Sequence, residues 1–416
     1  MYSGARVSAL RVCVDARLGS GRFGGVEQVV IGVASGLSRL GDGDEEYLFL
    51  TNPEHEEWLL PYLEGPCRIL HPRHSYARRR ARAIRKGLAE RIPVIGPRRS
   101  VRSSDGTIEA AGVDVVHFPF QDAFTTDVPS LYQPHDLQHL HLPELFSRWI
   151  YERRERIYRT HCERAEAVVA MTSWGRRDLI SSYGLTEEKV WVVPGASVLP
   201  EYPAPSDEDL EEIRARLALP AGFLLYPAQP WPHKNHERLL EALALIRDRT
   251  GTTIPLVCSG AEPGAFDRVR ARAGELGLER TIVFPGFVSP KELRGLYELA
   301  TALVFPSLFE GWGLPVCEAF SAGLPVASSS STGLPELVGD AGLIFDPEST
   351  DQTADAVQRI WTDDALRRTL AERGIERSEL VSWDHTARLF RAHYRRIGGR
   401  SLAEEDRILL AASPPA

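Results

Sequence analysis

Two glutamates flank a glycine-rich turn near the start of a predicted helix. Glu310 and Glu318 have seven residues between them, and Gly311-Trp312-Gly313 follows the first of them. Val304-Phe305 is typical of the end of a buried strand, and Pro315 suits the first position of a helix, where a missing N–H costs nothing. This start places Glu318 in the first helical turn. The free N–H groups of that turn and the helix dipole form a site for an anionic ligand such as a diphosphate.

The block around these glutamates matches more than two positions. Residues 307–326 read S-L-F-E-G-W-G-L-P-V-C-E-A-F-S-A-G-L-P-V. This block resembles the E-x7-E signature of the retaining, nucleotide-sugar-dependent glycosyltransferases of family 4, which have the GT-B fold. The resemblance implies that Glu310 contacts the donor sugar and that Glu318 holds the ribose hydroxyls of the nucleotide. An acidic residue that favours the helix dipole is the structural alternative.

Length and composition indicate a two-domain protein. At 416 residues the chain exceeds what one hydrophobic core usually supports. Its net charge of −8 argues against a general affinity for nucleic acid, which requires a basic surface. The five scattered cysteines fit a reducing cytosol, and no apolar run is long enough to span a bilayer. We therefore expect a cytoplasmic protein.

The elements that must position these residues alternate along the chain. In the first half, strands are expected near 11–16, 46–51, 67–71, 113–118, 130–133, 167–172 and 189–193, and helices over 24–40 and 148–165. In the second half, strands are expected near 223–227, 254–259, 281–284, 302–305, 326–328 and 342–345, with helices between them. Such alternation is typical of parallel sheets covered on both faces. It predicts an α/β fold of two doubly wound, Rossmann-like domains.

A proline cluster marks the boundary between the two domains. Pro200, Pro203 and Pro205 stand between periodic segments and precede an acidic helix start at Asp207-Glu208-Asp209. We expect an acceptor-side domain over 1–203, a donor domain over 204–383, and a C-terminal helix and tail over 384–416. The resemblance implies that the terminal helix crosses back to the first domain. It also implies a central cleft, because the ligand-binding loops of both domains lie at the carboxyl ends of their strands.

Lys234 stands in a segment that follows one predicted strand and leads into a helix. The segment 226–240, Y-P-A-Q-P-W-P-H-K-N-H-E-R-L-L, resembles the family's phosphate-gripping turn, and Lys234 matches the lysine that neutralises the diphosphate. Ala228 replaces the usual glycine and His233 the usual arginine. A neutral histidine supplies less positive charge to the leaving group than arginine does. The alternative for Lys234 is a solvated lysine at a helix start.

Histidines close two strands of the first half. In the segment 132–141, Y-Q-P-H-D-L-Q-H-L-H, the His-Asp-Leu triplet resembles a family segment whose histidine reaches the donor sugar, and His135 is the matching residue. Asp136 has the chemistry to orient its ring. A structural histidine or a turn cap is the alternative, and it remains open for His117, His139 and His141.

Three further turns are expected to line the cleft. Residues 19–28, G-S-G-R-F-G-G-V-E-Q, resemble the family's glycine-rich loop, whose backbone N–H groups approach the donor phosphates or the acceptor. By resemblance, the turn 285–289 with Val288 contacts the nucleobase, and 329–336 lines the sugar–phosphate side. All three are also ordinary strand-to-helix turns.

One segment reverses the acidic character of the chain. Residues 73–102 carry eleven Arg and Lys residues and a single acid, Glu90. This density of positive charge suggests an anionic partner, such as a lipid-linked or phosphorylated acceptor at the inner membrane face. A solvated charge run is the alternative, and the sequence favours it slightly.

Together these features predict a retaining, metal-independent glycosyl transfer from a nucleotide sugar to a hydroxyl acceptor. The candidate catalytic residues are Glu310, His135 and Lys234. The candidate donor-binding residues, which lie on turns at the expected cleft, are Glu318, His233, Gly311, Trp312, Gly313, Leu314, Gly24, Gly25 and Val288. No D-x-D pair or His/Asp/Glu cluster marks a divalent metal site, and no cofactor is expected. The alternatives are another GT-B enzyme, such as a sugar phosphorylase or a nucleotide-sugar epimerase, and a weakened nucleotide-sugar-binding protein.

Overall fold

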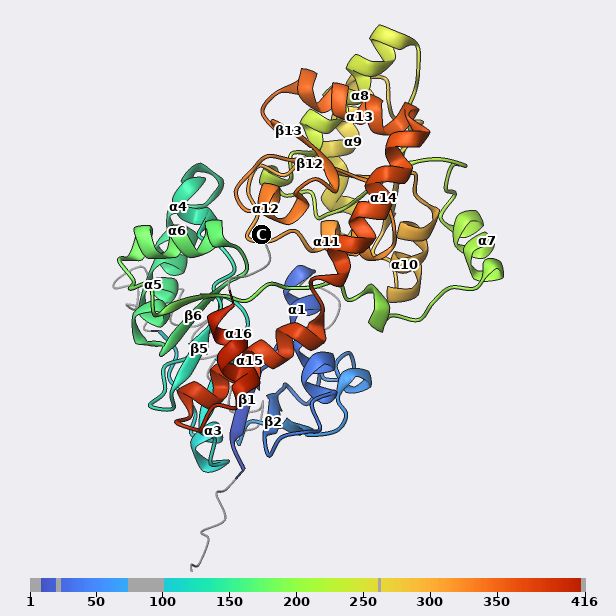
Figure 1. Ribbon diagram of the computed structural model, residues 1–416. Coiled ribbons are helices and arrows are strands. Elements are labelled where there is room, and N and C mark those ends of the chain that lie inside the picture. The colour runs from blue at the N-terminus through green and yellow to red at the C-terminus, as the bar shows by residue number, and fades with distance from the viewer. Residues whose placement is uncertain (1–8, 20–23, 74–100, 261–262, 413–416) are drawn as a thin grey trace, which may run out of the picture.

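The fold consists of two α/β domains that stand one above the other in Figure 1, a computed structural model. The structure describes residues 9–19, 24–73, 101–260 and 263–412. Each domain is built around one parallel sheet, as the alternating pattern of the sequence predicted.

The first sheet has seven strands in the order β3-β2-β1-β4-β5-β6-β7. Val12 pairs in parallel with Tyr47 on one side and Val115 on the other. Its strands are β1 (Arg11–Asp15), β2 (Glu46–Leu50), β3 (Cys67–Leu70), β4 (Val115–Phe118), β5 (Ser130–Tyr132), β6 (Ala167–Ala170) and β7 (Val190–Val192).

The second sheet has six strands and repeats this winding in the order β10-β9-β8-β11-β12-β13. In both sheets the strand order reverses beside the first strand, and such a switch point opens a ligand crevice at the carboxyl ends of the strands. Its strands are β8 (Leu224–Pro227), β9 (Leu256–Ser259), β10 (Ile282–Gly286), β11 (Ala302–Phe305), β12 (Val326–Ser329) and β13 (Gly342–Phe345).

Helices cover both faces of each sheet. In the first domain they are α1 (Gly25–Ser38), α3 (Thr107–Ala110), α4 (Gln138–His141), α5 (Arg148–Arg164) and α6 (Ser173–Tyr183). The later helices are α7 (Asp207–Arg216), α8 (His236–Thr250), α9 (Asp267–Glu275), α10 (Pro290–Leu299), α11 (Leu314–Ser321), α12 (Leu334–Val338), α13 (Thr350–Thr362), α14 (Asp364–Glu379), α15 (Trp383–Ile397) and α16 (Glu404–Ala411).

Alternate residues of β1 enter two different cores. Val12 and Val14 belong to a cluster that includes Phe390 of α15, whereas Cys13 belongs to a separate cluster with Tyr158 of α5. Successive strand side chains point to opposite faces, so this split shows that the sheet is buried on both sides. The near-continuous apolar runs of the sequence follow from that burial.

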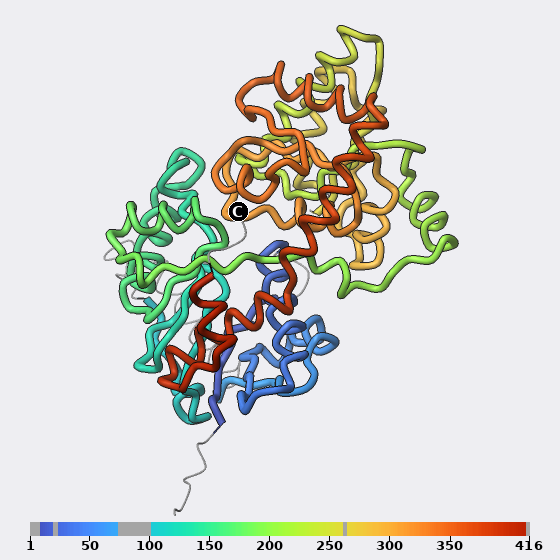
Figure 2. The backbone as a smooth tube through the Cα atoms, viewed as in Figure 1, coloured from blue at the N-terminus to red at the C-terminus, as the bar shows by residue number. Residues whose placement is uncertain are grey.

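The chain crosses between the domains twice, and the two crossings lie together in Figure 2. The first leads from β7 to α7, and the second leads from α14 to α15. Thr386 of α15 donates a hydrogen bond to the Pro194 carbonyl of the first crossing, 2.8 Å away. α15 then packs on α1, where a Cβ at Gly32 would meet the Trp383 ring at 1.8 Å. The expected return of the C-terminal helix to the first domain is therefore confirmed.

Candidate functional site

The helix that carries Glu318 begins earlier than the sequence predicted. α11 starts at Leu314, directly after Gly313, whose φ of +132° suits only glycine. Pro315 is thus the second residue of the helix, where its missing N–H again costs no intrahelical bond. Glu318 is the fifth residue, so its predicted place in the first turn is wrong. Because α11 has no acidic residue in its first turn, a dipole-favouring role no longer accounts for Glu318.

Lys234 and Glu310 form an ion pair beside the start of α11. The Nζ of Lys234 lies 2.6 Å from Oε1 of Glu310, and the two side chains are 16% and 13% exposed. Their loops follow β8 and β11, which are neighbours in the second sheet. This partial burial strengthens the pair compared with a surface ion pair. Lys234 is therefore no freely solvated lysine.

Backbone contacts fix the loop of Lys234 to the loop of Glu310. The His233 carbonyl accepts hydrogen bonds from the backbone N–H of Leu308 at 2.7 Å and from the hydroxyl of Ser307 at 3.1 Å. Asn235 has a left-handed φ of 61° and donates its side-chain amide to the carbonyls of Pro306 and Pro347. Asparagine tolerates this conformation better than most residues do. These bonds hold Lys234 in place from both sides.

His233 is neutral at ordinary pH. Burial, reinforced by the neighbouring charge of Lys234, lowers the pKa of the His233 ring to about 4. Lys234 therefore supplies the formal positive charge of this pair of residues. The sequence predicted that His233 supplies less positive charge to the leaving group than arginine would, and the lowered pKa is consistent with that prediction.

His135 belongs to the first domain, and its backbone carbonyl lies next to Gly311 of the second domain. Its Nε2 lies 2.8 Å from the Pro119 carbonyl, so Nε2 carries the proton and Nδ1 is left as the acceptor of the ring. Burial lowers the pKa of the ring to about 4. His135 also has a left-handed φ of 69°, an uncommon conformation for histidine that is found mostly at turns and functional sites.

Gly311 allows the two domains to touch at this point. A Cβ at position 311 would lie 2.3 Å from the His135 carbonyl oxygen and 3.3 Å from Cβ of Asp136. No real Cβ tolerates the first of these distances. The first glycine of the Gly-x-Gly turn is therefore required for the close approach of the two walls of the cleft.

Glu318 is buried where the two domains meet. It is 2% exposed, and its two carboxylate oxygens accept hydrogen bonds from Gln28 Nε2 of α1 and from the Tyr297 hydroxyl of α10, each at 2.5 Å. Burial raises the pKa of the Glu318 carboxyl to about 7, although both hydrogen bonds act in the opposite direction.

The described end of the glycine-rich loop lies against the second domain. A Cβ at Gly24 would lie 3.9 Å from Nε2 of Gln229, and one at Gly25 would lie 3.3 Å from Cδ1 of Leu314. Residues 20–23 of this loop lie outside the described part of the chain. Val288, in the turn before α10, packs half-buried against the core. The roles predicted for these residues remain predictions.

The three histidines for which the structural alternative stayed open have structural partners in the first domain or in α15. Each has a ring nitrogen within hydrogen-bonding distance of a buried or half-buried oxygen, which favours the structural alternative. The pairs are His117 with Tyr394, His139 with Glu155, and His141 with Asp178.

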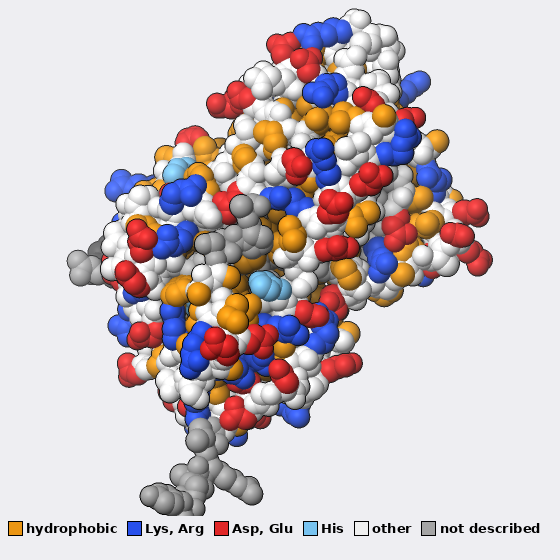
Figure 3. Space-filling model, viewed as in Figure 1, with side chains coloured by type: hydrophobic (Ala, Val, Ile, Leu, Met, Phe, Trp, Pro, Cys, Tyr) orange, Lys and Arg blue, Asp and Glu red, His pale blue; other side chains and the backbone are white. Residues whose placement is uncertain are grey.

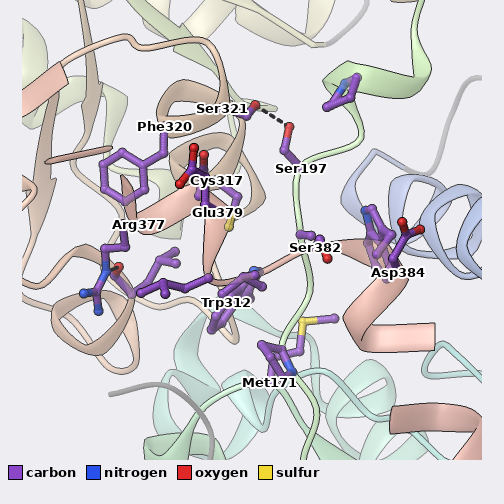
Figure 4. Close-up of a pocket in the computed structure, with 18 of the residues that line it drawn as sticks. Met171, Ser197, Trp312, Cys317, Phe320, Ser321, Arg377, Glu379, Ser382 and Asp384 are labelled. Carbon is purple, nitrogen blue, oxygen red and sulfur yellow. Dashed lines mark hydrogen bonds between the residues drawn. The ribbon is translucent and has the colours of Figure 1, made fainter. Parts of the chain in front are cut away.

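A cavity of about 360 Å³ lies at the domain crossings, away from the Lys234–Glu310 pair. Figure 4 shows Trp312 and Cys317 on its second-domain side, with Ser382 and Asp384 on the other. The hydroxyls of Ser321 and Ser197 bond across its edge at 2.7 Å. The indole of Trp312 thus lines this cavity at the domain crossings. Its predicted contact with the donor remains a prediction.

Surface charge and possible metal ligands among the described residues do not extend the candidate site. On the face shown in Figure 3, acidic and basic side chains are mixed over both domains. Among the described residues, no three His, Cys, Asp or Glu side chains are grouped to hold a metal ion. None of the described helices combines the length and apolar character needed to cross a membrane. Most of the basic segment, residues 74–100, lies outside the described residues, so its anionic partner stays a prediction.

Sequence reasoning missed three residues that shape the site. They are Gln28, Tyr297 and Thr332; the hydroxyl of Thr332 donates to the Glu310 carbonyl at 2.7 Å. Thr332 lies in a turn that the sequence did place at the cleft. Gln28 ends the glycine-rich segment 19–28, which the sequence also placed at the cleft, but nothing singled it out there. Tyr297 stands inside a helical pattern, where no local signal distinguishes it from other polar residues.

Two parallel-sheet, Rossmann-like domains that face one another are the architecture of the GT-B class of glycosyltransferases. The family description "Glycosyltransferase Family 4" matches residues 23–196, and "Glycosyl transferases group 1" matches residues 209–377. The O-antigen chain mannosyltransferase B of Escherichia coli is 30% identical over 268 residues, which cover 62% of this chain and 70% of the relative. The chain therefore belongs to glycosyltransferase family 4, as the E-x7-E block predicted.

Two further comparisons describe how far the likeness extends. The serotype-specific mannosyltransferase WbdA of Escherichia coli is 30% identical over 233 residues, and the matched part is 55% of this chain but only 28% of WbdA. The crystal structure of HepE from Anabaena in complex with UDP and glucose has a TM-score of 0.69 and 18% identity, and the match covers 93% of this chain and all of HepE. At that identity, the likeness to HepE shows the shared GT-B fold.

Proposed function

We propose that this chain transfers a sugar from a nucleoside diphosphate sugar to a hydroxyl acceptor with retention of the anomeric configuration. The observation that carries the proposal is the Lys234–Glu310 pair beside the N-terminus of α11. A positive side chain and the free N–H groups of the helix start suit a diphosphate, and a carboxylate next to them suits sugar hydroxyls.

In the proposed reaction, the bond between the anomeric carbon and the diphosphate oxygen breaks as the acceptor oxygen bonds to the same face of that carbon. The acceptor proton passes to the departing phosphate oxygen, as the family resemblance implies. Lys234 and the N–H groups of the Gly311–Leu314 turn stabilise the negative charge that develops on the diphosphate. Glu310 positions the sugar, and His135 offers Nδ1 to one of its hydroxyls.

We further propose that no divalent metal is required, because Lys234 and the helix start already supply the positive potential. Activity should then survive excess EDTA. A cytoplasmic location and a peripheral contact with anionic membranes rest on the sequence alone. Co-sedimentation with anionic vesicles at low salt tests that contact.

The test of the proposed function is a donor panel. UDP-, GDP-, ADP- and dTDP-linked sugars are screened by thermal shift, because a ligand that binds the folded state raises the melting temperature. Mannose and glucose donors come first, because two relatives are named mannosyltransferases and HepE was solved with UDP and glucose. Hits are assayed for transfer, and NMR gives the anomeric configuration of the product.

The panel also separates the alternatives. A requirement for orthophosphate indicates a phosphorylase, and isomerisation of the sugar without an acceptor indicates an epimerase. Binding without hydrolysis or transfer indicates a nucleotide-sugar-binding protein. Each of these results would replace the proposed transferase activity.

A further inference from the structure

Gln28 joins the first domain to the most buried carboxylate of the second. It lies in the first turn of α1, yet its side-chain amide donates to Oε1 of Glu318 at 2.5 Å. The other oxygen of Glu318 accepts from Tyr297 at 2.5 Å. The two domains therefore share a charge-assisted hydrogen bond inside the predicted donor site.

Three elements enclose this carboxylate. Gln28 comes from α1 and Tyr297 from α10, and Tyr202 comes from the first crossing between the domains. Burial and the charge of Glu318 raise the pKa of the Tyr202 phenol, which is itself buried. With 2% of Glu318 exposed, a ligand reaches its oxygens only after one of these neighbours moves.

The side chains around Glu318 differ in how easily a ligand could displace them. Tyr297 belongs to the same domain as Glu318 and is fully buried, so its bond persists when the domains separate. Gln28 belongs to the opposite wall and is half-buried. Its side-chain amide is a hydrogen-bond donor, as a ribose hydroxyl is. The amide occupies Oε1 of Glu318.

We propose that Gln28 competes with the ribose of the donor nucleotide for Glu318. The inference rests on the proposed function and adds a residue that sets nucleotide affinity. A nucleotide must displace the Gln28 amide before its ribose hydroxyls bond to Oε1 of Glu318. Gln28 thereby lowers the affinity for the nucleotide and masks part of the preference for a ribose over a 2′-deoxyribose.

The experiment compares wild-type protein with Gln28→Met, which keeps the side-chain volume, and Gln28→Ala, which removes it. Isothermal titration gives the Kd of the nucleoside diphosphate preferred in the donor panel and of its 2′-deoxy counterpart. We expect both variants to bind the ribonucleotide about tenfold more tightly, the scale of one hydrogen bond to a charged group. The 2′-deoxy compound should gain less.

Two controls separate competition from a general loosening of the domains. Ser197→Ala removes the bond to Ser321, a contact between the first crossing and α11. The Ser321 hydroxyl also donates to the backbone carbonyl of Glu318 at 2.9 Å, but neither serine is bonded to the Glu318 carboxylate. It should leave the affinity unchanged. In a Glu318→Gln background, the gain from Gln28→Met should shrink, because the shared partner has lost its charge.

The outcomes are distinguishable from those of the proposed function. If wild-type protein binds none of the four nucleoside diphosphates, the proposed function fails and the inference fails with it. If wild-type protein binds a nucleotide but the Gln28 variants bind it equally or less tightly, only the competition is overturned. An equal gain in Ser197→Ala would also overturn it.

Discussion

The two walls of the cleft differ in charge and in the way their side chains are held. The second domain presents Lys234, Glu310 and Glu318, each fixed by a hydrogen bond or an ion pair. The first domain presents a neutral histidine and an amide, His135 and Gln28, and one carboxyl, Asp136, whose pKa is raised by burial. The positive charge that suits a nucleoside diphosphate sugar is thus provided by the second domain, and the first domain lies against it mainly with uncharged groups.

This difference matches what each wall must do during a reaction. A developing charge is best stabilised by groups that are already in place, because they need no reorganisation. A wall that opens and closes must avoid strong charges, since burying an unpaired charge at each closure is costly. Changes in the second domain should therefore affect chemistry most, and changes at the contact should affect closure.

The largest expected effect comes from removing the charge of the second-domain wall. Lys234→Ala should reduce kcat/KM for the donor by about 10²–10³-fold, the scale for losing one preorganised contact to the transition state. Lys291→Ala is the matched control, because Lys291 also pairs with an acid, Asp209, but its side chain is 41% exposed near the start of α10. Initial rates at varied donor concentration give both values. A loss below about threefold for Lys234→Ala would show that this lysine does not stabilise the leaving group.

Glu318→Gln should show by how much the buried carboxylate lowers the unfolding free energy. The pKa of Glu318 is raised from 4.5 to about 7, so the folded state holds a proton that the unfolded state has lost between these values. Stability therefore falls as pH rises through this window, by up to about 3 kcal/mol above pH 7. Relative to wild type, the variant should gain unfolding free energy between pH 5 and pH 8.

Denaturant unfolding at both pH values measures that gain. Glu298→Gln, an exposed position on α10, provides the reference, and its effect should be the same at both pH values. A pH-independent effect of Glu318→Gln would mean that the carboxyl is not perturbed by burial.

Gly311→Ala tests the contact between the walls. The added Cβ meets the His135 carbonyl oxygen at 2.3 Å, so the domains must separate slightly or the turn must shift. A misplacement on the scale of 1 Å should lower kcat by about 10- to 100-fold. The melting temperature should change little, because each domain keeps its own core. An unchanged kcat would show that the walls do not meet in this way during turnover.

The smallest expected effect lies at a further contact between the domains. Glu336 of α12 accepts hydrogen bonds from the backbone N–H groups of Ser173 and Trp174 at the start of α6. Glu336→Ala should lower the unfolding free energy by about 1 kcal/mol, the usual cost of a lost helix cap. Glu336→Gln keeps an acceptor oxygen and should retain about half or more of that stability. Equal stability of wild type and Glu336→Ala would contradict a capping role across the domains.

The sequence predicted the sheets and the main charged residues because their signals are local. Apolar runs gave each strand to within a few residues, and the E-x7-E block located Glu310 and Glu318. The start of α11 was displaced, since proline fits either of the first two helical positions and only the φ of Gly313 distinguishes them.

Contacts between distant segments could not be predicted. Gln28 and Glu318 are 290 positions apart, and their bond depends on how two separately folded domains meet. The requirement for glycine at position 311 arises in the same way, because the atom that a Cβ would meet belongs to His135 of the other domain. Local sequence patterns carry no information about contacts between separately folded domains.

The most direct measurement compares diphosphate binding in Lys234→Ala and His135→Ala. Isothermal titration of the preferred nucleoside diphosphate and of its parent nucleoside isolates the contribution of the phosphates. We predict that Lys234→Ala weakens diphosphate binding by about tenfold or more and leaves nucleoside binding unchanged. His135→Ala should bind both as wild type does while its kcat falls. An equal loss of diphosphate affinity in His135→Ala, or no loss in Lys234→Ala, would contradict the assignment of the donor charges to the second domain.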